Sequence, residues 1–471
     1  MTKPEMIKPD RTQPERTTLF SRIAVIDIGK TNAKLVVVER GSGAEIAARR
    51  MPNRVLTDGP YPHYDTDALW RFILDALGAL FRETGFEAIS VTTHGAAAAL
   101  LDAEGALALP VLDYEHAYPQ EIRADYDRLR PDFAETFSPR LPGGLNLGAQ
   151  LHYQKRSFPD DFARVERIVT YAQYWAGRLT GVFATEVTSL GCHTDLWRPR
   201  EGGFSSLVDR LALGDLIAAP RPAFDVLGPV LPDIAAGLGL PGSLPVFCGL
   251  HDSNASLLPH LMTREGALSV VSTGTWVVSF AVGGDLDHLD PARDTLANVD
   301  ALGRAVPSAR FMGGREYERL TADLPPVSAP EIAAAVPGLL ARGIMYLPNA
   351  VPGSGPFPRR QGGWRSETGV SDAERHAAIA LYLALMTASG LALLGRRGPI
   401  LVEGPFSANE TYLAALSGVT GAEVLALGSS TGTSAGAACL AGGPAVPAQA
   451  RAVAPLPMDA YAAAWRAATL V

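Results

Sequence analysis

The chain has 471 residues, 47% of them hydrophobic, and a formal net charge of −8 at pH 7. This length exceeds what one hydrophobic core usually serves, so we expect two large domains. The acidic balance excludes the dense Lys and Arg surface that nucleic acids and anionic membranes attract, so neither is an expected partner.

The cysteines and the first residues indicate a soluble cytoplasmic protein. Cys192, Cys248 and Cys439 are widely spaced and include no CxxC pair, which predicts neither a disulfide framework nor a zinc site. Residues 1–20 lack the apolar segment of a secretory signal, and we expect them to form a disordered tail. No apolar run approaches the roughly 18 residues of a membrane span without interruption by a charge, Gly or Pro.

The first predicted element is a β-hairpin with polar residues at its turn. Residues 23–28 are largely β-branched, as in a buried strand, and residues 33–38 form a second apolar run. The turn reads Gly29-Lys-Thr-Asn32, in which Gly lets a ligand approach the backbone and the other side chains offer donors to phosphate oxygens. Asp27 lies near the end of the first strand. A tight turn without a ligand explains the same residues, so both interpretations stay open.

Helix and strand then alternate, as in a crossover unit. Residues 67–84 have apolar side chains at helical spacing, and residues 88–92 resume strand character before Thr93-His-Gly95. His94 is a candidate contact for a ligand, and a core histidine with satisfied hydrogen bonds is the alternative. Residues 112–116 form a further polar cluster whose spacing matches no metal site.

The central segment, residues 246–256, is a short apolar run that breaks at Gly249 and presents His251, Asp252 and Asn254 before helix-like sequence. Open α/β sheets place their ligand crevice where a strand passes into a helix, and the free N–H groups of the helix favour an anion there. An aspartate in this position is more often only an N-cap, so the segment alone does not decide its role.

A second strand-turn-strand unit follows in the second half. Residues 267–272 and 276–280 are the strands, and Thr273-Gly-Thr275 is the turn. The repetition predicts two similarly built domains that face one nucleotide.

The last part of the chain is predicted to alternate helix and strand again. Ser371 and Glu374 have the spacing of a capping box, and helical periodicity continues to residue 394. A strand over residues 399–402 leads into the turn Glu403-Gly-Pro-Phe-Ser-Ala-Asn409 and a helix that begins near Glu410. Residues 430–437 are small and read as a helix start.

These motifs together resemble the FGGY carbohydrate kinase family of the actin-like ATPase superfamily, from about residue 23 to residue 443. The motifs at residues 249–255 and 272–276 are most similar to those of the branch that contains rhamnulokinase and fuculokinase. The motifs, in the family's order, are Asp27-Ile-Gly-Lys-Thr-Asn32, Thr93-His-Gly95, Gly249-Leu-His-Asp-Ser-Asn-Ala255, Ser272-Thr-Gly-Thr-Trp276 and Glu403-Gly-Pro-Phe-Ser-Ala-Asn409.

The resemblance implies an α/β fold of two actin-like, ribonuclease-H-like domains with a central cleft. Residues 21–258 would bind the sugar and residues 259–471 would bind ATP. The implied reaction is the ATP-dependent phosphorylation of a ketose with Mg²⁺, in a cytoplasmic protein that is compatible with a homodimer. L-Fuculose, L-rhamnulose, xylulose and ribulose all remain open as the acceptor.

The resemblance also assigns roles to individual residues. Asp252 would be the general base that takes the proton of the attacking sugar hydroxyl, and Asp27 would bind Mg²⁺. The remaining roles are sugar contacts for Thr93, His94 and Asn254, γ-phosphate contacts for Lys30, Thr31 and Asn32, phosphate contacts for Thr273, Gly274 and Thr275, and adenosine contacts for Gly404 and Asn409.

Two departures from the family pattern are visible. Many relatives have a small or hydroxyl residue in place of Lys30, so this lysine is either an extra charged clamp or a surface residue. Relatives usually have a Gly-Gly pair where this chain has Glu403-Gly-Pro, which leaves the adenine contacts open. The alternative function is a nucleotide-binding actin-superfamily protein without sugar kinase activity, and the presence of both Asp252 and His94 favours the kinase.

Overall fold

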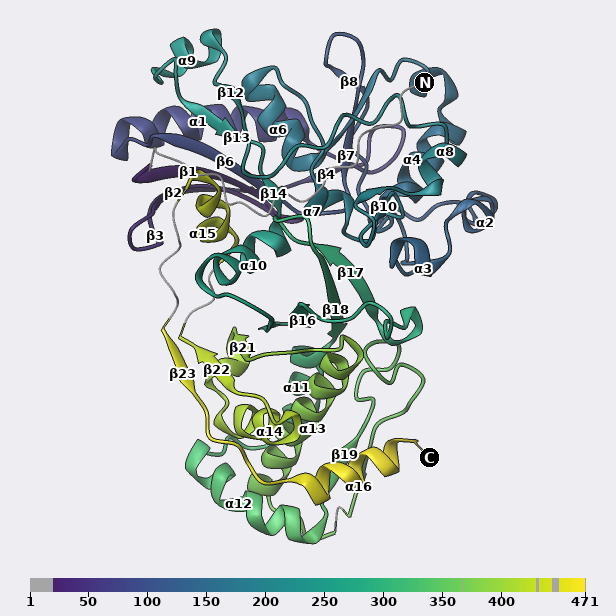
Figure 1. Ribbon diagram of the computed structural model, residues 1–471, viewed down its shortest axis with the longest axis vertical. Coiled ribbons are helices and arrows are strands. Elements are labelled where there is room, and N and C mark those ends of the chain that lie inside the picture. Colours follow the sequence, from purple (N-terminus) through teal and green to yellow (C-terminus); the bar gives the residue numbers. More distant parts are fainter. Residues whose placement is uncertain (1–19, 367, 429–431, 443–448, 471) are drawn as a thin grey trace. The chain divides into compact units, whose positions relative to one another are not determined.

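The computed structural model describes residues 20–366, 368–428, 432–442 and 449–470, so nearly all of the expected N-terminal tail lies outside it. The chain forms two compact units, whose elements are labelled in Figure 1. Unit 1 comprises Met1–Glu265, Ala297–Ala305 and Thr431–Pro447, and unit 2 comprises Gly266–Leu296, Val306–Ser430 and Ala448–Val471.

This division differs from the expected single boundary between residues 258 and 259. That boundary falls inside helix α10 (Asp252–Thr263), which packs on helix α15 (Thr433–Ala438) and on the sheet of unit 1. The contact keeps the chain in unit 1 as far as Glu265 and brings a late segment of the chain back to it.

Unit 1 is built on a sheet whose strand order is β12-β13-β6-β1-β2-β3, with β14 pairing to β6. The predicted hairpin of β1 and β2 is confirmed as an antiparallel pair, and β6 runs parallel to β1. The strands are β1 (Arg22–Ile28), β2 (Asn32–Glu39), β3 (Ala44–Pro52), β6 (Ala88–Thr93), β12 (Val226–Pro229), β13 (Pro245–Phe247) and β14 (Leu250–His251).

Strand β1 buries both of its faces, because side chains alternate along a strand. Ala24, Ile26 and Ile28 pack with helices α1 (Thr66–Thr84) and α6 (Tyr171–Thr180). Ile23 and Val25 pack with α10 and α15 on the other face, and Figure 1 shows α15 against β1 and β2. The alternation puts Asp27 on the α10 and α15 side.

Smaller strands and further helices complete unit 1. The strands are β4 (Val55–Leu56), β5 (His63–Tyr64), β7 (Ala98–Leu101), β8 (Leu107–Leu109), β9 (Arg167–Thr170), β10 (Trp197–Arg198) and β11 (Gly203–Phe204). The helices are α2 (Gln120–Leu129), α3 (Phe133–Thr136), α4 (Leu147–Ser157), α5 (Pro159–Phe162), α7 (Val187–Leu190), α8 (Ser206–Arg210), α9 (Pro232–Leu238) and the 3₁₀ turn η3 (Cys439–Ala441).

Unit 2 repeats the plan of unit 1, since an antiparallel hairpin is followed in the sheet by a parallel strand. Strand β15 pairs antiparallel with β16 and parallel with β21, in the order β17-β18-β16-β15-β21-β22-β23. The strands are β15 (Leu268–Thr273), β16 (Val277–Val282), β17 (Thr295–Val299), β18 (Ala305–Phe311), β21 (Ile400–Glu403), β22 (Val424–Leu427), β23 (Ala450–Ala452) and the separate pair β19 (Met345–Leu347) and β20 (Gly363–Arg365). The segment Ala297–Ala305, which includes most of β17, is assigned to unit 1.

Helix α13 (Asp372–Leu393) is the centre of the unit 2 core. Ser371 and Glu374 form the predicted capping box at its start, which is therefore confirmed. Among the described helices it alone is long and apolar enough for a membrane span, yet 78% of that stretch is buried within the protein. The other helical elements are η1 (Pro291–Arg293), α11 (Gly313–Thr321), α12 (Ala329–Arg342), η2 (Pro405–Ala408), α14 (Glu410–Thr420) and α16 (Asp459–Leu470).

Candidate active site

The candidate base, Asp252, is the first residue of α10 and follows β14 directly. The strand is interrupted between β13 and β14 at Gly249, whose φ is +85°. A Cβ there would lie 2.4 Å from the Val91 carbonyl oxygen of β6, so only Gly fits. The Gln173 amide of α6 donates to the carbonyls of Cys248 and Gly249, at 2.9 and 3.0 Å, and fixes the break.

The Asp252 carboxylate is 28% exposed and is held by its own helix start. Its Oδ1 accepts hydrogen bonds from the Ser253 N–H at 2.6 Å and from the Ser253 hydroxyl at 3.2 Å, and it lies 3.1 Å from His251 Nε2. Burial raises the pKa of Asp252, and the two hydrogen bonds from Ser253 oppose the rise. A carboxylate of raised basicity at a helix start is suited to accept a proton.

His94 follows β6 and lies among aromatic rings. Its ring centroid is 5.0 Å from that of Tyr64, 5.5 Å from that of Tyr114 and 5.2 Å from that of Tyr171. Burial lowers the pKa of His94 to about 4, so the imidazole is neutral at pH 7. Its Nδ1 lies 2.8 Å from the Gly95 carbonyl oxygen, and its buried Nε2 has no hydrogen-bond partner among the described residues. The free nitrogen makes His94 a candidate ligand contact rather than a satisfied core residue.

His251 connects the two motifs through a contact that requires Gly95. A Cβ on Gly95 would lie 2.7 Å from His251 Nε2, the nitrogen next to Asp252. The Thr-His-Gly turn therefore needs its Gly to admit the His251 ring. Burial lowers the pKa of His251 to about 4, so this ring is also neutral at pH 7.

A hydrogen-bond chain from α7 supports the Asp252 junction. The buried Glu186 carboxylate accepts the Thr188 N–H at 3.0 Å and the Thr188 hydroxyl proton. The Thr188 hydroxyl oxygen accepts the His251 N–H at 2.9 Å, one residue before Asp252. Burial raises the pKa of Glu186 to about 7. Nothing in the spacing of these residues along the sequence pointed to the chain they form.

Asp27 is the second-last residue of β1, and two hydroxyls from α15 hold its partly buried carboxylate. Its Oδ2 accepts hydrogen bonds from Thr433 at 2.8 Å and from Ser434 at 2.9 Å, and Lys34 Nζ lies 4.0 Å away. Burial raises the pKa of Asp27, and the two hydroxyl donors and the Lys34 charge oppose the rise. The sequence predicted Asp27 but missed Thr433 and Ser434, whose only signal was a helix start made of small residues.

The turn of the first hairpin separates its candidate residues into two groups. Thr31 and Asn32 are exposed at the tip, where the Asn32 amide donates to the Thr31 hydroxyl at 3.0 Å. Lys30 instead forms an ion pair with Asp113, and its Nζ lies 3.5 Å from Glu115 Oε2. The polar cluster at residues 112–116, which matched no metal site, thus contributes carboxylates to the surroundings of Lys30.

The other two candidate sugar contacts are buried in unit 1. The Thr93 hydroxyl donates to the His94 carbonyl oxygen at 3.1 Å. Asn254 lies in α10, and neither its amide nitrogen nor its oxygen has a hydrogen-bond partner among the described residues. Asn254 therefore joins His94 as a buried polar group that is available to a ligand.

In unit 2, Thr273 connects the second hairpin to the Glu403 turn. Its hydroxyl donates to the Glu403 carbonyl at 2.6 Å and accepts the Phe406 N–H at 3.0 Å. A Cβ on Gly404 would lie 2.0 Å from the Thr273 carbonyl oxygen, so this Gly is required by the packing of the two turns. The Asn409 side chain accepts the Tyr412 N–H at 3.0 Å and caps α14.

The tip of the second hairpin lies against the start of α11. Gly274 and Thr275 are exposed, and the Gly274 N–H donates to the Trp276 carbonyl at 2.9 Å. A Cβ on Gly314 would lie 2.1 Å from the Gly274 carbonyl oxygen, which shows how closely α11 approaches the turn. The structure thus brings Thr273, Gly274, Thr275 and Gly404 together in unit 2.

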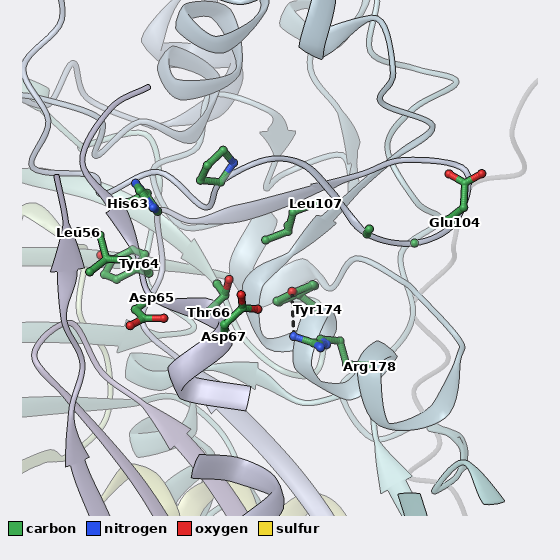
Figure 2. A pocket seen from close by; sticks show the side chains of 13 residues that line it. Leu56, His63, Tyr64, Asp65, Thr66, Asp67, Glu104, Leu107, Tyr174 and Arg178 are labelled. Carbon is green, nitrogen blue, oxygen red and sulfur yellow. Dashed lines mark hydrogen bonds between the residues drawn. The ribbon is translucent and has the colours of Figure 1, made fainter. Parts of the chain in front are cut away.

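A separate cavity of about 530 Å³ lies in unit 1 beside the start of α1. Figure 2 shows Thr66 and Asp67 at this helix start, and Arg178 directed to the Tyr174 hydroxyl. Tyr64 lines the cavity and also contacts His94, but Asp252, Asp27 and His94 do not line it. The candidate chemistry therefore lies outside this cavity.

Two curated relatives of the chain are named as L-fuculokinases. An L-fuculokinase from Salmonella typhi is 26% identical over 285 residues, which cover 56% of this chain and 57% of the relative. An L-fuculokinase from Escherichia coli (strain K12) is 25% identical over 280 residues with the same coverage. The match thus spans little more than half the length of these relatives.

Solved structures resemble the chain over nearly its full length. A carbohydrate kinase from Novosphingobium aromaticivorans is 36% identical with a TM-score of 0.90, covering 96% of this chain and 99% of that chain. A xylulose kinase from Lactobacillus acidophilus has a TM-score of 0.74 over 95% of this chain and 96% of that one, at 15% identity, and shows likeness of fold alone.

Two family models match the chain one after the other. The N-terminal domain of the FGGY family of carbohydrate kinases matches residues 22–259, and the FGGY C-terminal domain matches residues 265–450. The predicted two-domain α/β fold and the family resemblance are both confirmed. The chain belongs to the FGGY family of carbohydrate kinases.

Proposed function

We propose that the chain transfers the γ-phosphoryl group of ATP to a hydroxyl of a ketose, with Asp252 as the general base. The observation that carries this proposal is the pairing of Asp252 with His94 in unit 1. A carboxylate of raised pKa lies within electrostatic reach of a neutral imidazole whose Nε2 has no partner among the described residues. This combination provides a proton acceptor and a separate group to orient the hydroxyl-bearing substrate.

In the proposed reaction the sugar hydroxyl oxygen attacks the γ-phosphorus. The new oxygen–phosphorus bond forms as the bond to the β,γ-bridging oxygen breaks, and ADP leaves with that oxygen. Asp252 takes the hydroxyl proton and later releases it to solvent. His94 and Asn254 have the buried polar atoms to bind the other sugar hydroxyls.

The phosphate contacts are proposed for both hairpin turns. Thr31 and Asn32 are exposed at the first turn, and Gly274 and Thr275 are exposed at the second. The Thr273 hydroxyl already donates to one backbone group and accepts from another, so its contribution would come from the backbone. Asn409 caps α14, and Gly404 is therefore the better candidate neighbour of the adenosine.

Asp27 fits a magnesium ion. Mg²⁺ is usually held by one or two carboxylates, by substrate phosphates and by water. Thr433 and Ser434 both donate to Asp27 Oδ2, which leaves Oδ1 for the ion or its water shell. The described residues contain no cluster of three or more His, Cys, Asp or Glu ligands, in keeping with an ion held largely by phosphate. When bound, Mg²⁺ neutralises charge on the phosphate oxygens.

The curated relatives support a deoxyketohexose such as L-fuculose as the acceptor, and L-rhamnulose, xylulose and ribulose are the next candidates. The wide spacing of the cysteines supports a cytoplasmic location for this reaction. Both statements belong to the proposal.

The test is ADP release with Mg²⁺-ATP across ketopentoses, ketohexoses and 6-deoxyketohexoses, with the phosphosugar identified by mass spectrometry. We expect turnover of at least one ketose and a loss of kcat of about 100-fold or more in Asp252→Asn, because an amide cannot take the proton. ATP binding to the variant, measured by calorimetry, should stay unchanged.

Two results would contradict the proposal. Full activity of Asp252→Asn would show that another group is the base. Binding of ATP without phosphorylation of any sugar in the panel would favour a nucleotide-binding protein that does not act as a sugar kinase.

A further inference from the structure

Lys30 lies in the turn of the first hairpin, and its side chain contacts residues that surround His94. Its ammonium forms an ion pair with Asp113 and lies 3.5 Å from Glu115 Oε2. Lys30 and Asp113 are 18% and 8% exposed, so the pair is largely shielded from water, whereas Glu115 is 69% exposed. We refer to Lys30 and Asp113 as the charge pair.

Aromatic rings connect the charge pair to His94. Lys30 Nζ lies 5.2 Å from the centre of the Tyr64 ring and 4.7 Å from that of the Tyr114 ring, within the range of cation–π attraction. The same two rings contact the His94 ring. The Tyr64 hydroxyl also donates to Asp113 Oδ1 at 3.4 Å. The charge pair, the two tyrosines and His94 therefore form one continuous cluster.

The cluster lies within electrostatic reach of Asp252. The charges of Asp252 and Lys30 both act on the pKa of His94, in opposite directions. The pKa of Tyr114 is raised to about 12, chiefly by burial and further by the charges of Glu115, Asp113 and Asp252. Such coupling declines with distance, so the charge pair borders the same region as the candidate base.

The charges in this region sum to a negative value. Lys30 contributes one positive charge, which Asp113 balances, and His94 is neutral at pH 7. Asp252 and Glu115 add negative charge that no further described cation in the cluster offsets. A carboxylate on the acceptor would be repelled here, whereas a neutral sugar would find donors and acceptors for its hydroxyls.

We propose that Asp113 determines whether the site accepts charged or uncharged sugars. Because Asp113 forms an ion pair with Lys30, the ammonium does not bind an acceptor carboxylate, and the site prefers uncharged sugars to sugar acids. This inference rests on the proposed function and adds a specificity-determining residue to it. Loss of the Asp113 charge leaves the Lys30 ammonium with only the exposed Glu115 beside it, and a carboxylate of the acceptor can then pair with it.

The test compares neutral sugars with sugar acids in the Asp113→Asn variant. The neutral panel is L-fuculose, L-rhamnulose, xylulose and ribulose, and the acidic panel is gluconate and xylonate. We expect the ratio of kcat/KM for the best neutral sugar to that for the best acid to fall by about 100-fold, because like-charge repulsion becomes pairing. Asp215→Asn, which changes an exposed aspartate of the same unit, should leave the ratio unchanged.

A double variant identifies the cation responsible. The gain on sugar acids should disappear in Lys30→Met/Asp113→Asn, because the ammonium that would bind the carboxylate is gone. The single variant Lys30→Met keeps the carboxylates of Asp113 and Glu115 but removes the positive charge beside them. Gluconate should therefore inhibit sugar phosphorylation more weakly in this variant than in the wild type. This second measurement applies even if Asp113→Asn does not fold.

The inference and the proposed function fail in different ways. A wild type that binds ATP but phosphorylates no sugar contradicts the proposed function. A wild type that phosphorylates a neutral sugar, with a specificity ratio that Asp113→Asn changes by less than about twofold, contradicts only the role of Asp113. A gain on sugar acids that persists without Lys30 also contradicts it.

Discussion

The backbone before Asp252 is held by a hydrogen bond to Thr188. The Thr188 hydroxyl can donate only one proton, and the Glu186 carboxylate takes it, so the hydroxyl oxygen is left to accept the His251 N–H. This arrangement fixes the backbone immediately before Asp252. Thr188 is therefore a positioning residue for the proposed base.

We expect Thr188→Val to lower kcat by about tenfold or more while the KM for ATP stays unchanged, because a small displacement of a catalytic group slows the chemical step. Thr188→Ser keeps the hydroxyl and should restore most of the activity. A steady-state comparison of the two variants checks this. Equal kcat values in the valine and serine variants would mean that the hydroxyl does not position Asp252.

A motif beside the end of a strand was enough to single out candidate residues, whose roles remain predictions. Asp27, His94 and Asp252 all lie in unit 1 with pKa values shifted by burial. The partners of these residues were not predictable in the same way. Thr433 is 406 residues away from Asp27 along the chain, and no local pattern encodes such a contact.

At the scale of elements, α15 packs unusually closely on α10. A Cβ on Gly436 would lie 1.7 Å from the Ala255 carbonyl oxygen, so even one methyl group forces the helices apart. The start of the same helix supplies Thr433 and Ser434 to Asp27. Packing and the candidate metal ligand are therefore coupled through one short helix.

We expect Gly436→Ala to lower the free energy of unfolding by about 2 kcal/mol or more, the cost of overpacking a close contact. It should also raise the KM for Mg²⁺-ATP, because α15 moves away from Asp27. Gly237→Ala is the matched control: this glycine also lies in a helix, α9, and a Cβ would meet nothing within 4 Å. The control should be neutral or stabilising by up to about 1 kcal/mol.

Denaturant unfolding and steady-state kinetics measure both effects. Equal stability of the two alanine variants would show that α10 and α15 separate without cost.

Elements whose pattern is local were predicted with nearly their observed bounds. The helix expected over residues 67–84 is α1 (Thr66–Thr84), and the capped helix expected to reach residue 394 is α13 (Asp372–Leu393). Both have strong apolar periodicity and a cap that marks the start. The pairing of β6 with β1 and the return of α15 to unit 1 depend on tertiary contacts, which periodicity does not contain.

At the scale of the whole molecule, each unit contains a buried glutamate of strongly raised pKa. Burial raises the pKa of Glu186 in unit 1 and of Glu316 in unit 2 to about 7, from an ordinary 4.5. Between these values the folded chain holds protons that the unfolded chain releases. The free energy of unfolding therefore falls as the pH rises through this window.

We expect Glu186→Gln and Glu316→Gln to reduce this pH dependence, each by about 3 kcal/mol between pH 4.5 and 8, because glutamine does not titrate. His94 and His251 give the opposite slope, since their pKa values are lowered to about 4, but they are common to wild type and variants. Thermal unfolding across this pH range, with the exposed Glu201→Gln as control, measures the difference. Parallel curves for all four proteins would contradict the prediction.

Because α15 belongs to unit 1 but comes late in the sequence, unit 1 can be completed only near the end of synthesis. A nascent chain that has left the ribosome only as far as Glu265 has made every strand of the first sheet, but not the residues of α15 that cover Ile23 and Val25. The apolar face remains open, and the Asp27 carboxylate lacks its two hydroxyl donors, until translation has passed through unit 2. A prematurely ended product therefore cannot complete its first unit, and the proposed kinase activity requires synthesis of nearly the whole chain.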